Sequence, residues 1–370
     1  MSILIFIAIL AVLIIVHEFG HFLVARFFGI RVDEFGIGYP PRALTFFTWM
    51  GTKFTLNWLP FGGFVKIFGE NGPEAEATNG EVAKGKSFTD APRGAQALVL
   101  LAGVTFNIIF AWLLLSVGFM SGLPKQVDPV KNPELVSSAE LLIAAVSSGS
   151  PASEVGLMAG DTITAVYTAN NVVEILTPDG VASFIASHGD EIINISFKRG
   201  NNETSVETLA VTPSAGILED RKAVGISMNL VSDLSLPIHK AFWEGAKTTA
   251  NLTFLTASGL GVFLFDAIRG SSDFSQVTGP VGIVGLVGDA SELGFVYLIS
   301  FTAFISINLA VINLVPFPAL DGGRLLFVVI EAIKRSPISP KITNIVNAVG
   351  FLLLIGLMVL VTVNDVLKLF

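Results

Sequence analysis

Four stretches of the chain are apolar over lengths that suit membrane-crossing helices. The first combines residues 3–16 and 22–30 and is interrupted by a short polar motif. The other three cover approximately residues 95–123, 294–314 and 345–363. A hydrocarbon core of about 30 Å requires roughly 20 residues of helix. The pattern therefore predicts a multi-pass α-helical membrane protein with about four spans.

Two regions between these stretches have the pattern of β-structure. Residues 52–58 alternate between polar and apolar side chains, and glycine-rich segments lie on both sides at 35–38 and 61–64. This predicts a β-hairpin or small sheet that could dip into the membrane. A longer region, from Lys125 to about Leu236, has short β-rich runs with turn residues between them. Its length is typical of one soluble domain.

Composition supports the membrane assignment. Hydrophobic residues make up 52% of the 370 residues, and charged residues only 14%, about half the usual share in soluble proteins. The chain has no cysteine, which excludes disulfides and thiolate metal sites. A net charge of −8 provides no basic stripe for nucleic acid. We therefore expect a lipid environment and no nucleic-acid partner.

The first apolar stretch contains an HExxH sequence, His17-Glu18-Phe19-Gly20-His21. Residues i and i+4 share one face of a helix, so both imidazoles can reach a single metal ion. Zinc takes nitrogen ligands and keeps an open position for water, and Glu18 could accept a proton from that water. Ionisable groups inside an apolar helix indicate function. The alternative is a His–Glu pair solvated by lipid headgroups at the end of an ordinary span.

Two histidines leave zinc short of a third protein ligand, and Asp321 is the candidate. Pro316 and Pro318 cannot continue the third span as a regular helix, so the chain must leave helical geometry before Asp321. Asp321 could instead only cap a helix that starts at Gly323. Asn313, in the same irregular stretch, could bind the backbone of an extended substrate. It could equally form a hydrogen bond that repairs the broken helix.

Together these motifs resemble the site-2 protease family of intramembrane metalloproteases, and most closely its RseP-type bacterial branch. The resemblance covers nearly the whole chain. It implies that His17, His21 and Asp321 bind zinc and that Glu18 is the general base. Val104 stands where the family often has proline. The matching segments, in the family's order, are residues 17–21, 103–107 and 313–322, with 35–38, 51–53 and 60–66 similar to its membrane-reentrant β-loop.

The middle region resembles a PDZ domain of the bacterial protease type. Residues 149–152 and 156–161 match the usual pattern of that domain. A PDZ domain binds an extended peptide by adding a strand to its sheet. The alternative is a rigid spacer without a peptide ligand. The better known members of the branch carry two such domains, whereas this chain shows one.

Basic residues predict the orientation in the membrane. Residues 31–93 contain seven lysines and arginines, and the connection between the last two spans adds Arg324, Lys334, Arg335 and Lys341. The positive-inside rule places both connections in the cytoplasm, and the PDZ-like domain and both termini outside. A fifth crossing at 241–265 would separate Asp321 from the HExxH sequence. We therefore expect that segment to be an interfacial amphipathic helix.

The predicted organisation has four parts. Residues 1–123 hold two spans with the HExxH sequence and the β-loop, residues 124–236 the PDZ-like domain, residues 237–293 the interfacial segment, and residues 294–370 the last two spans. An edge of the β-loop, at 52–58 or 64–68, could pair with an unwound substrate, or the loop could only brace the helices.

The sequence thus predicts an intramembrane zinc metalloprotease of the cell membrane that cuts peptide bonds in or near transmembrane segments. By resemblance, its substrates are single-span membrane proteins such as anti-sigma factors, or remnant signal peptides. One alternative is a catalytically silent scaffold, which is expected to lack Glu18 or a ligand. Another is a metal transporter, which is expected to show internal repeats.

Overall fold

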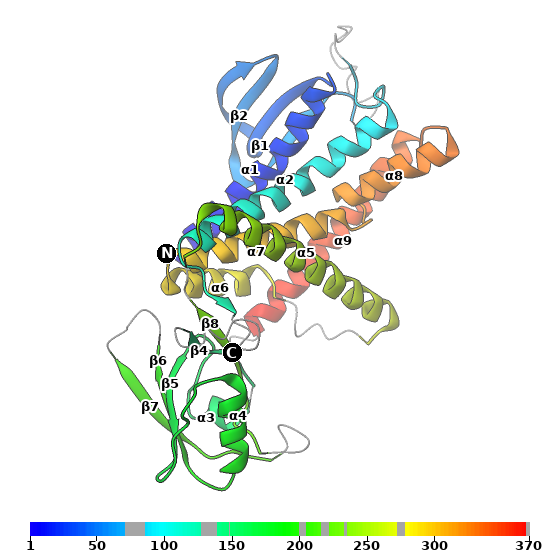
Figure 1. Cartoon of the computed structure of the whole chain (residues 1–370). Helices are drawn as coiled ribbons and strands as arrows, with labels where there is room; N and C mark the ends of the chain where they lie inside the picture. Colours follow the sequence, from blue (N-terminus) through cyan, green and yellow to red (C-terminus); the bar gives the residue numbers. More distant parts are fainter. Residues whose placement is uncertain are drawn as a thin grey trace. The chain divides into compact units, whose positions relative to one another are not determined.

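A computed structural model of the chain (Figure 1) describes residues 1–70, 86–126, 139–147, 149–199, 205–215, 222–232, 235–271 and 278–367. The chain divides into two compact units. The first, here called the helical unit, comprises Met1–Val117, Ile238–Ser291 and Leu298–Phe370. The second, the sheet unit, comprises Gly118–Pro237 and Glu292–Tyr297.

The elements follow one another along the chain as helices interrupted by two β-regions. Their bounds are α1 (Ser2–Phe27), β1 (Val32–Trp49), β2 (Thr52–Ile67), α2 (Arg93–Met120), β3 (Lys125–Gln126), β4 (Glu140–Val146), α3 (Pro151–Glu154), β5 (Thr162–Tyr167), α4 (Pro178–Ser187), β6 (Ile193–Lys198), β7 (Val206–Val211), β8 (Ile226–Ser232), α5 (Ile238–Arg269), α6 (Pro280–Leu293), α7 (Phe295–Leu314), α8 (Asp321–Lys334) and α9 (Pro340–Leu367).

Five helices of the described chain are long and apolar enough to cross a membrane: α1, α2, α5, α7 and α9. Four of them coincide with the predicted spans. The fifth, α5, contains the segment predicted to lie at the interface, and it is the least apolar of the five. Length and composition also make α5 a candidate span. The described chain therefore confirms several long apolar helices, whereas the number of about four spans stays a prediction. The interfacial placement of α5 stays a prediction.

Close backbone contacts hold the helical unit together. A Cβ atom on Gly20 would lie only 2.6 Å from the carbonyl oxygen of Ala102, so glycine is what allows α1 and α2 to approach this closely. Small residues at such contacts are typical of helices that associate in lipid. Helix α7 joins them through the Ser306 hydroxyl, which donates to the backbone oxygen of Asn107 at 2.9 Å.

Helix α6 was not predicted, and a buried carboxylate fixes its start. Asp365 of α9 is 5% exposed and accepts hydrogen bonds from the backbone N–H groups of Gly279 and Gly282, at 3.1 and 2.9 Å. The first N–H groups of a helix have no partner within the helix, and a negative charge at this end is favourable. Asp365 therefore satisfies this helix end from the far end of α9.

The predicted hairpin is a sheet of two long strands that double back on themselves. Residues 32–37 of β1 pair with 63–67 of β2 on one side and with 53–56 of β2 on the other. Residues 42–49 of β1 then pair with 52–57 of β2. Four segments therefore lie side by side in the order 63–67, 32–37, 52–57 and 42–49. Within the described chain, only the two outer segments have an edge without a strand partner.

The sheet unit is an α+β fold with one six-stranded sheet in the order β3-β8-β4-β5-β6-β7. The predicted β-rich runs form β4, β5 and β6. Alternate residues of these strands are buried with the apolar side of α4, which gives the unit a core of its own. The PDZ assignment of this unit stays a prediction. The largest fully buried side chains of this core are Phe197, Leu141, Ile143, Ile193, Ile195 and Leu230.

An ion pair with a buried carboxylate fixes the turn that precedes β5. Asp161 is 1% exposed, accepts a hydrogen bond from the Met158 backbone N–H at 2.9 Å, and pairs with Arg199 through two contacts of 2.7 Å. The hydrogen bond from Asp161 raises the pKa of Arg199 above its ordinary value. Because the pair joins the start of β5 to the end of β6, it stabilises the pairing of these strands.

We predict that Asp161→Ala destabilises the sheet unit by about 2–3 kcal/mol, because it removes the charged hydrogen bonds of a buried carboxylate and leaves the Met158 N–H without its acceptor. Hydrogen exchange of the β5 and β6 amides in the full chain measures this loss. Asp190→Ala is the matched control, because the ion pair of Asp190 with Lys222 is exposed and such pairs contribute at most about 1 kcal/mol. Equal protection in the two variants would contradict the prediction.

Candidate metal centre

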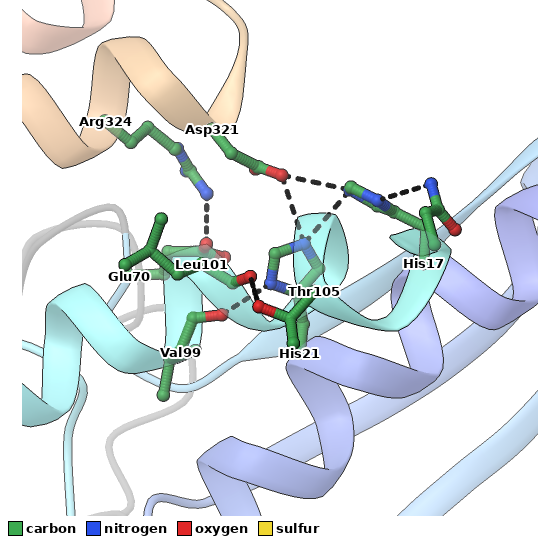
Figure 2. Close-up of polar contacts among 9 residues, drawn as sticks. His17, His21, Glu70, Val99, Leu101, Thr105, Asp321 and Arg324 are labelled. Atoms are coloured by element: carbon green, nitrogen blue, oxygen red, sulfur yellow. Dashed lines mark hydrogen bonds and ion pairs between the residues drawn. The ribbon is translucent and has the colours of Figure 1, made fainter. Parts of the chain in front are cut away.

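Three side chains from the two ends of the chain meet within the helical unit (Figure 2). The Nε2 atom of His17 lies 2.9 Å from Oδ2 of Asp321, and the Nε2 atom of His21 lies 3.2 Å from the same oxygen. The two Nε2 atoms are 3.2 Å apart. Both imidazoles are buried and come from one face of α1, as the spacing of four predicted. Asp321 comes from the first turn of α8.

This arrangement fits zinc. Ligands at 2.0–2.1 Å around a tetrahedral zinc ion lie about 3.3 Å from one another. The three donor atoms are 2.9 to 3.2 Å apart, so one ion placed among them would be within bonding distance of all three. Two imidazoles and one carboxylate are also a donor set that zinc accepts. Three protein ligands with an open fourth position are typical of catalytic zinc sites, whereas structural sites use four.

The chain around Asp321 is shaped by glycine. Helix α8 begins at Asp321, and the preceding residue, Leu320, occupies the N-cap position without a side-chain cap. The interpretation of Asp321 as only a cap of a helix from Gly323 is therefore wrong, because its carboxylate faces the imidazoles. A Cβ atom on Gly322 would overlap the carbonyl oxygens of Leu314 and Val315, so this residue must be glycine for the chain to fold back after α7.

Helix α2 orients the imidazole of His21. The Nδ1 atom of His21 lies 2.8 Å from the carbonyl oxygen of Val99, in a fully buried contact. A carbonyl oxygen only accepts, so Nδ1 carries the proton and donates it. The Nε2 lone pair is then free to bind a metal ion. Such a hydrogen bond from the second ring nitrogen is typical of histidine ligands and fixes both tautomer and ring orientation.

Asn107 plays the same part for His17. Its side chain is fully buried, and an amide atom lies 3.3 Å from Nδ1 of His17. With the amide nitrogen placed there, the amide oxygen has no partner among the described residues. The two amide atoms are distinguished only by their hydrogen bonds. With the oxygen facing His17, Nδ1–H donates to it, the buried oxygen is satisfied, and Nε2 is free for a metal ion.

Gly103 also contributes to the centre, and residue-level sequence reasoning did not identify its role. A Cβ atom at this position would lie 2.5 Å from Nε2 of His21 and 2.7 Å from Nε2 of His17. Glycine therefore lets the backbone of α2 lie directly against both imidazoles. The sequence carries a signal for this role: Gly103 and Asn107 lie four residues apart in a largely apolar helix. A polar amide in such a helix is energetically unfavourable, so its presence suggests a function.

Glu18 lies beside the sheet of the helical unit. The backbone of Val65 forms a hydrogen bond to its carboxylate. A Cβ atom on Gly63 would be 3.5 Å from Cγ of Glu18. The outer segment of β2, residues 63–67, thus lies next to the acidic residue of the HExxH sequence. This proximity was not predicted from the sequence.

Asn313 lies in the last turn of α7, half-buried, eight residues before Asp321. Within the described chain no hydrogen bond engages its side chain, so it does not repair the end of the helix. No hydrogen bond joins it to the three candidate ligands either. Arg324, one turn after Asp321, forms an ion pair with Glu70, which follows β2 (Figure 2).

Comparison with known proteins agrees with this centre. The model of peptidase family M50 matches residues 5–357, which include both metal-binding motifs. A protein of Clostridium perfringens named "Putative zinc metalloprotease" is 35% identical over 362 residues, 96% of this chain and 95% of the relative. A Nostoc protein of the same description is 32% identical over 374 residues, covering 100% of this chain and 97% of the relative. One of Clostridium acetobutylicum is 30% identical over 362 residues, 97% of this chain and 96% of the relative.

We predict that Gly103→Ala removes bound zinc while the protein still folds, because the added methyl group would occupy space beside both imidazoles. Zinc analysis of the purified protein measures the loss. Gly94→Ala is the matched control in the first turn of α2, since a Cβ atom there has no neighbour within 4 Å. A Gly103→Ala protein with as much zinc as the control would show that the backbone of α2 can retreat from the imidazoles.

Proposed function

Because the chain belongs to peptidase family M50 and is a zinc metalloendopeptidase, we propose that it cleaves membrane proteins within or beside their transmembrane segments. Its metal centre is built on α1, which is long and apolar enough to span a membrane. A substrate segment that reaches this centre must therefore be stable in the same apolar environment. Single-span membrane proteins, including anti-sigma factors and remnant signal peptides, meet this requirement.

In this proposal His17, His21 and Asp321 hold zinc. The observation that carries it is the convergence of their three donor atoms to within 3.2 Å from residues 304 positions apart in sequence. Zinc bound there supplies a Lewis acid that polarises the scissile carbonyl and lowers the pKa of water towards ~7. Asn107 and the carbonyl of Val99 keep both imidazoles in the tautomer that presents Nε2 to the ion.

Glu18 is the proposed general base. Its carboxylate accepts a proton from the attacking water as the bond from oxygen to the carbonyl carbon forms. It then donates this proton to the amide nitrogen as the carbon–nitrogen bond breaks, so that an amine leaves with a carboxylic acid, which transfers its remaining proton to the amine or to water. The hydrogen bond from Val65 fixes the position of this carboxylate. Asn313, whose amide is not engaged within the described chain, is proposed to bind the substrate backbone.

The orientation in the membrane belongs to the same proposal. The last turn of α1 carries Arg26, and the connections after α1 and after α7 are rich in lysine and arginine. By the positive-inside rule these connections face the cytoplasm of a cell-membrane protein, and the sheet unit faces outward. Water then reaches the zinc site from the cytoplasmic side.

The segment 63–67 is proposed to present the substrate. A transmembrane helix shields its peptide groups by internal hydrogen bonds, so it must unwind before hydrolysis, and the freed groups need partners. In the other candidate from the sequence, residues 52–58, the central residues 53–56 are paired with a strand segment on both sides and have no free edge. Residues 63–67 have a free edge within the described chain and lie beside Glu18.

The sheet unit is proposed to bind peptide in the manner of a PDZ domain. Strand β3 covers β8 only at Val231 and Ser232, which leaves residues 226–228 without a strand partner on that side in the described chain. A cavity of about 240 Å³ lies there between β8 and α4, lined by Ile185, Ile226 and Met228 among others. An extended peptide could pair with β8 and place an apolar side chain in this cavity.

The experiment that tests the function compares two substitutions in the metal centre. Glu18→Gln keeps size and metal ligands, so we expect zinc to remain while cleavage of a membrane substrate falls by ~10²–10⁴. Asp321→Ala removes a ligand, so zinc content and cleavage should fall together. Wild-type turnover by Glu18→Gln would refute the proposed base, and full zinc content in Asp321→Ala would refute the proposed ligand. A silent scaffold would show no cleavage even in the wild-type protein.

A proline scan tests substrate presentation. Proline removes a backbone donor, so substitutions at 63–67 should include positions that lower cleavage steeply while zinc and folding are preserved. Residues 44–49 form the other outer segment of the same sheet and provide the matched control, where proline should leave cleavage near the wild-type rate. Substrates with stable helices should suffer most, since those with Gly or Pro near the cut need less assistance. Equal rates for both segments would mean that the sheet only braces the helices.

A further inference from the structure

A cavity lies next to the candidate metal centre in the helical unit. It has a volume of about 490 Å³, within the range of ligand-binding sites. Its walls come from Glu70 after β2, from residues 88–100 at the start of α2, from α8, and from residues 337–344, which connect α8 to α9 and form the first turn of α9. The uncharged side chains of its lining include Thr89, Leu100, Phe327, Ile338 and Thr343.

An ion pair divides this cavity from the proposed zinc ligands. Arg324 and Glu70 both line the cavity, and they pair with each other. Arg324 lies one turn after Asp321 on α8, and Figure 2 shows the pair beside Asp321 and His21. The Glu70 carboxylate is also close enough to interact electrostatically with Glu18. The cavity is therefore adjacent to the place where the scissile bond would lie.

The lining suits a polypeptide segment. Leu100, Phe327 and Ile338 offer apolar surface, and Thr89 and Thr343 offer hydroxyl groups that can bind peptide N–H and C=O groups. The charges in the wall already pair with each other, Arg324 with Glu70 and Arg93 with Glu331 at 2.7 Å. A site built for a highly charged ligand would be expected to have unpaired charges of the opposite sign in its wall. The cavity instead fits an apolar chain with polar backbone groups.

The cavity also lies where an extended substrate would go. Glu70 follows the outer segment 63–67 by three residues, so a chain paired along this segment leads at one end towards the ion pair and the cavity behind it. Every wall of the cavity belongs to the two connections rich in lysine and arginine or to the helix ends next to them. These connections face the cytoplasm in the proposed orientation.

We propose that this cavity binds the part of the substrate that lies on the cytoplasmic side of the scissile bond, in extended conformation. The inference rests on the proposed function and adds the site that receives this portion of the chain. The substrate chain would then extend from Glu18 along the Glu70–Arg324 pair into the cavity.

Crosslinking can test this directly, because the chain has no cysteine of its own. In a Glu18→Gln background, Thr343→Cys places a thiol in the cavity wall. Ile333→Cys is the matched control, since Ile333 lies in the last turn of α8, ten residues before Thr343, is 79% exposed and does not line the cavity. A single-span substrate with one cysteine, moved through positions on both sides of the cut, is joined to each variant with a short bis-maleimide.

We expect Thr343→Cys to crosslink several-fold more than Ile333→Cys, and only with substrate cysteines on the cytoplasmic side of the cut. A third variant, Lys66→Cys in the segment 63–67, should crosslink to positions around the cut. Crosslinks from Lys66→Cys without any excess from Thr343→Cys would overturn the cavity proposal and leave the proposed function standing. If wild-type protein cleaves no membrane substrate, the proposed function itself fails.

A cavity-filling variant provides an independent measurement. Thr343→Trp should preserve zinc content and lower kcat/KM several-fold for a substrate with its full cytoplasmic segment. A substrate shortened to end just beyond the cut on that side should be cleaved by this variant and by wild type at similar rates. Unchanged rates on the full substrate, or the same loss on both substrates, would contradict the inference.

Discussion

The structure of the helical unit depends on bringing one carboxylate of α8 to two imidazoles of α1. Helix α1 is apolar along most of its length, so polar atoms in it are stable only when each has a partner. The partners come from α2, through the carbonyl of Val99 and the amide of Asn107. The geometry of the candidate metal centre is therefore a property of three helices, of which α1 and α8 supply the three proposed ligands.

Glycines determine how closely these helices approach. Gly20 and Gly103 lie on facing sides of α1 and α2, and a methyl group on either would meet a backbone carbonyl or the imidazoles. Gly322 has the same importance where the chain turns into α8. Glycine in a helix costs up to ~1 kcal/mol relative to alanine. Close approach of backbones offsets this cost, because association in lipid relies on packing and hydrogen bonds.

Much of the centre followed from local patterns. The spacing of His17 and His21 is a property of any helix, and the two prolines before Asp321 required a break in helical geometry near that residue. The start of α6 could not be predicted in this way, because it depends on Asp365, 83 residues or more away. The role of Gly103 was equally hard to predict, because it depends on the atoms that a Cβ at this position would contact and not on any periodic pattern in the sequence. Helix α5 was ambiguous for a related reason: length and apolar content do not distinguish a tilted span from an interfacial helix.

The pairing of β1 and β2, which double back on themselves, shows why a strand prediction alone could not identify the edge proposed to face the substrate. Period-two alternation was clearest at residues 52–58, but residues 53–56 of that stretch are paired on both sides, by 32–37 and by 42–49. The free edge beside Glu18 belongs to residues 63–67, where Gly63, together with Gly62 just before the segment, interrupts the alternating pattern and weakens its signal. A segment that must accept another chain cannot also be closed by a neighbour. A Cβ atom on Gly63 would lie 3.1 Å from the carbonyl oxygen of Gly36 and 3.2 Å from the Ile14 side chain. Glycine therefore lets this segment lie close to the neighbouring strand and to α1, so the residue that weakens the strand pattern in the sequence also brings the free edge near the acidic residue of the HExxH sequence.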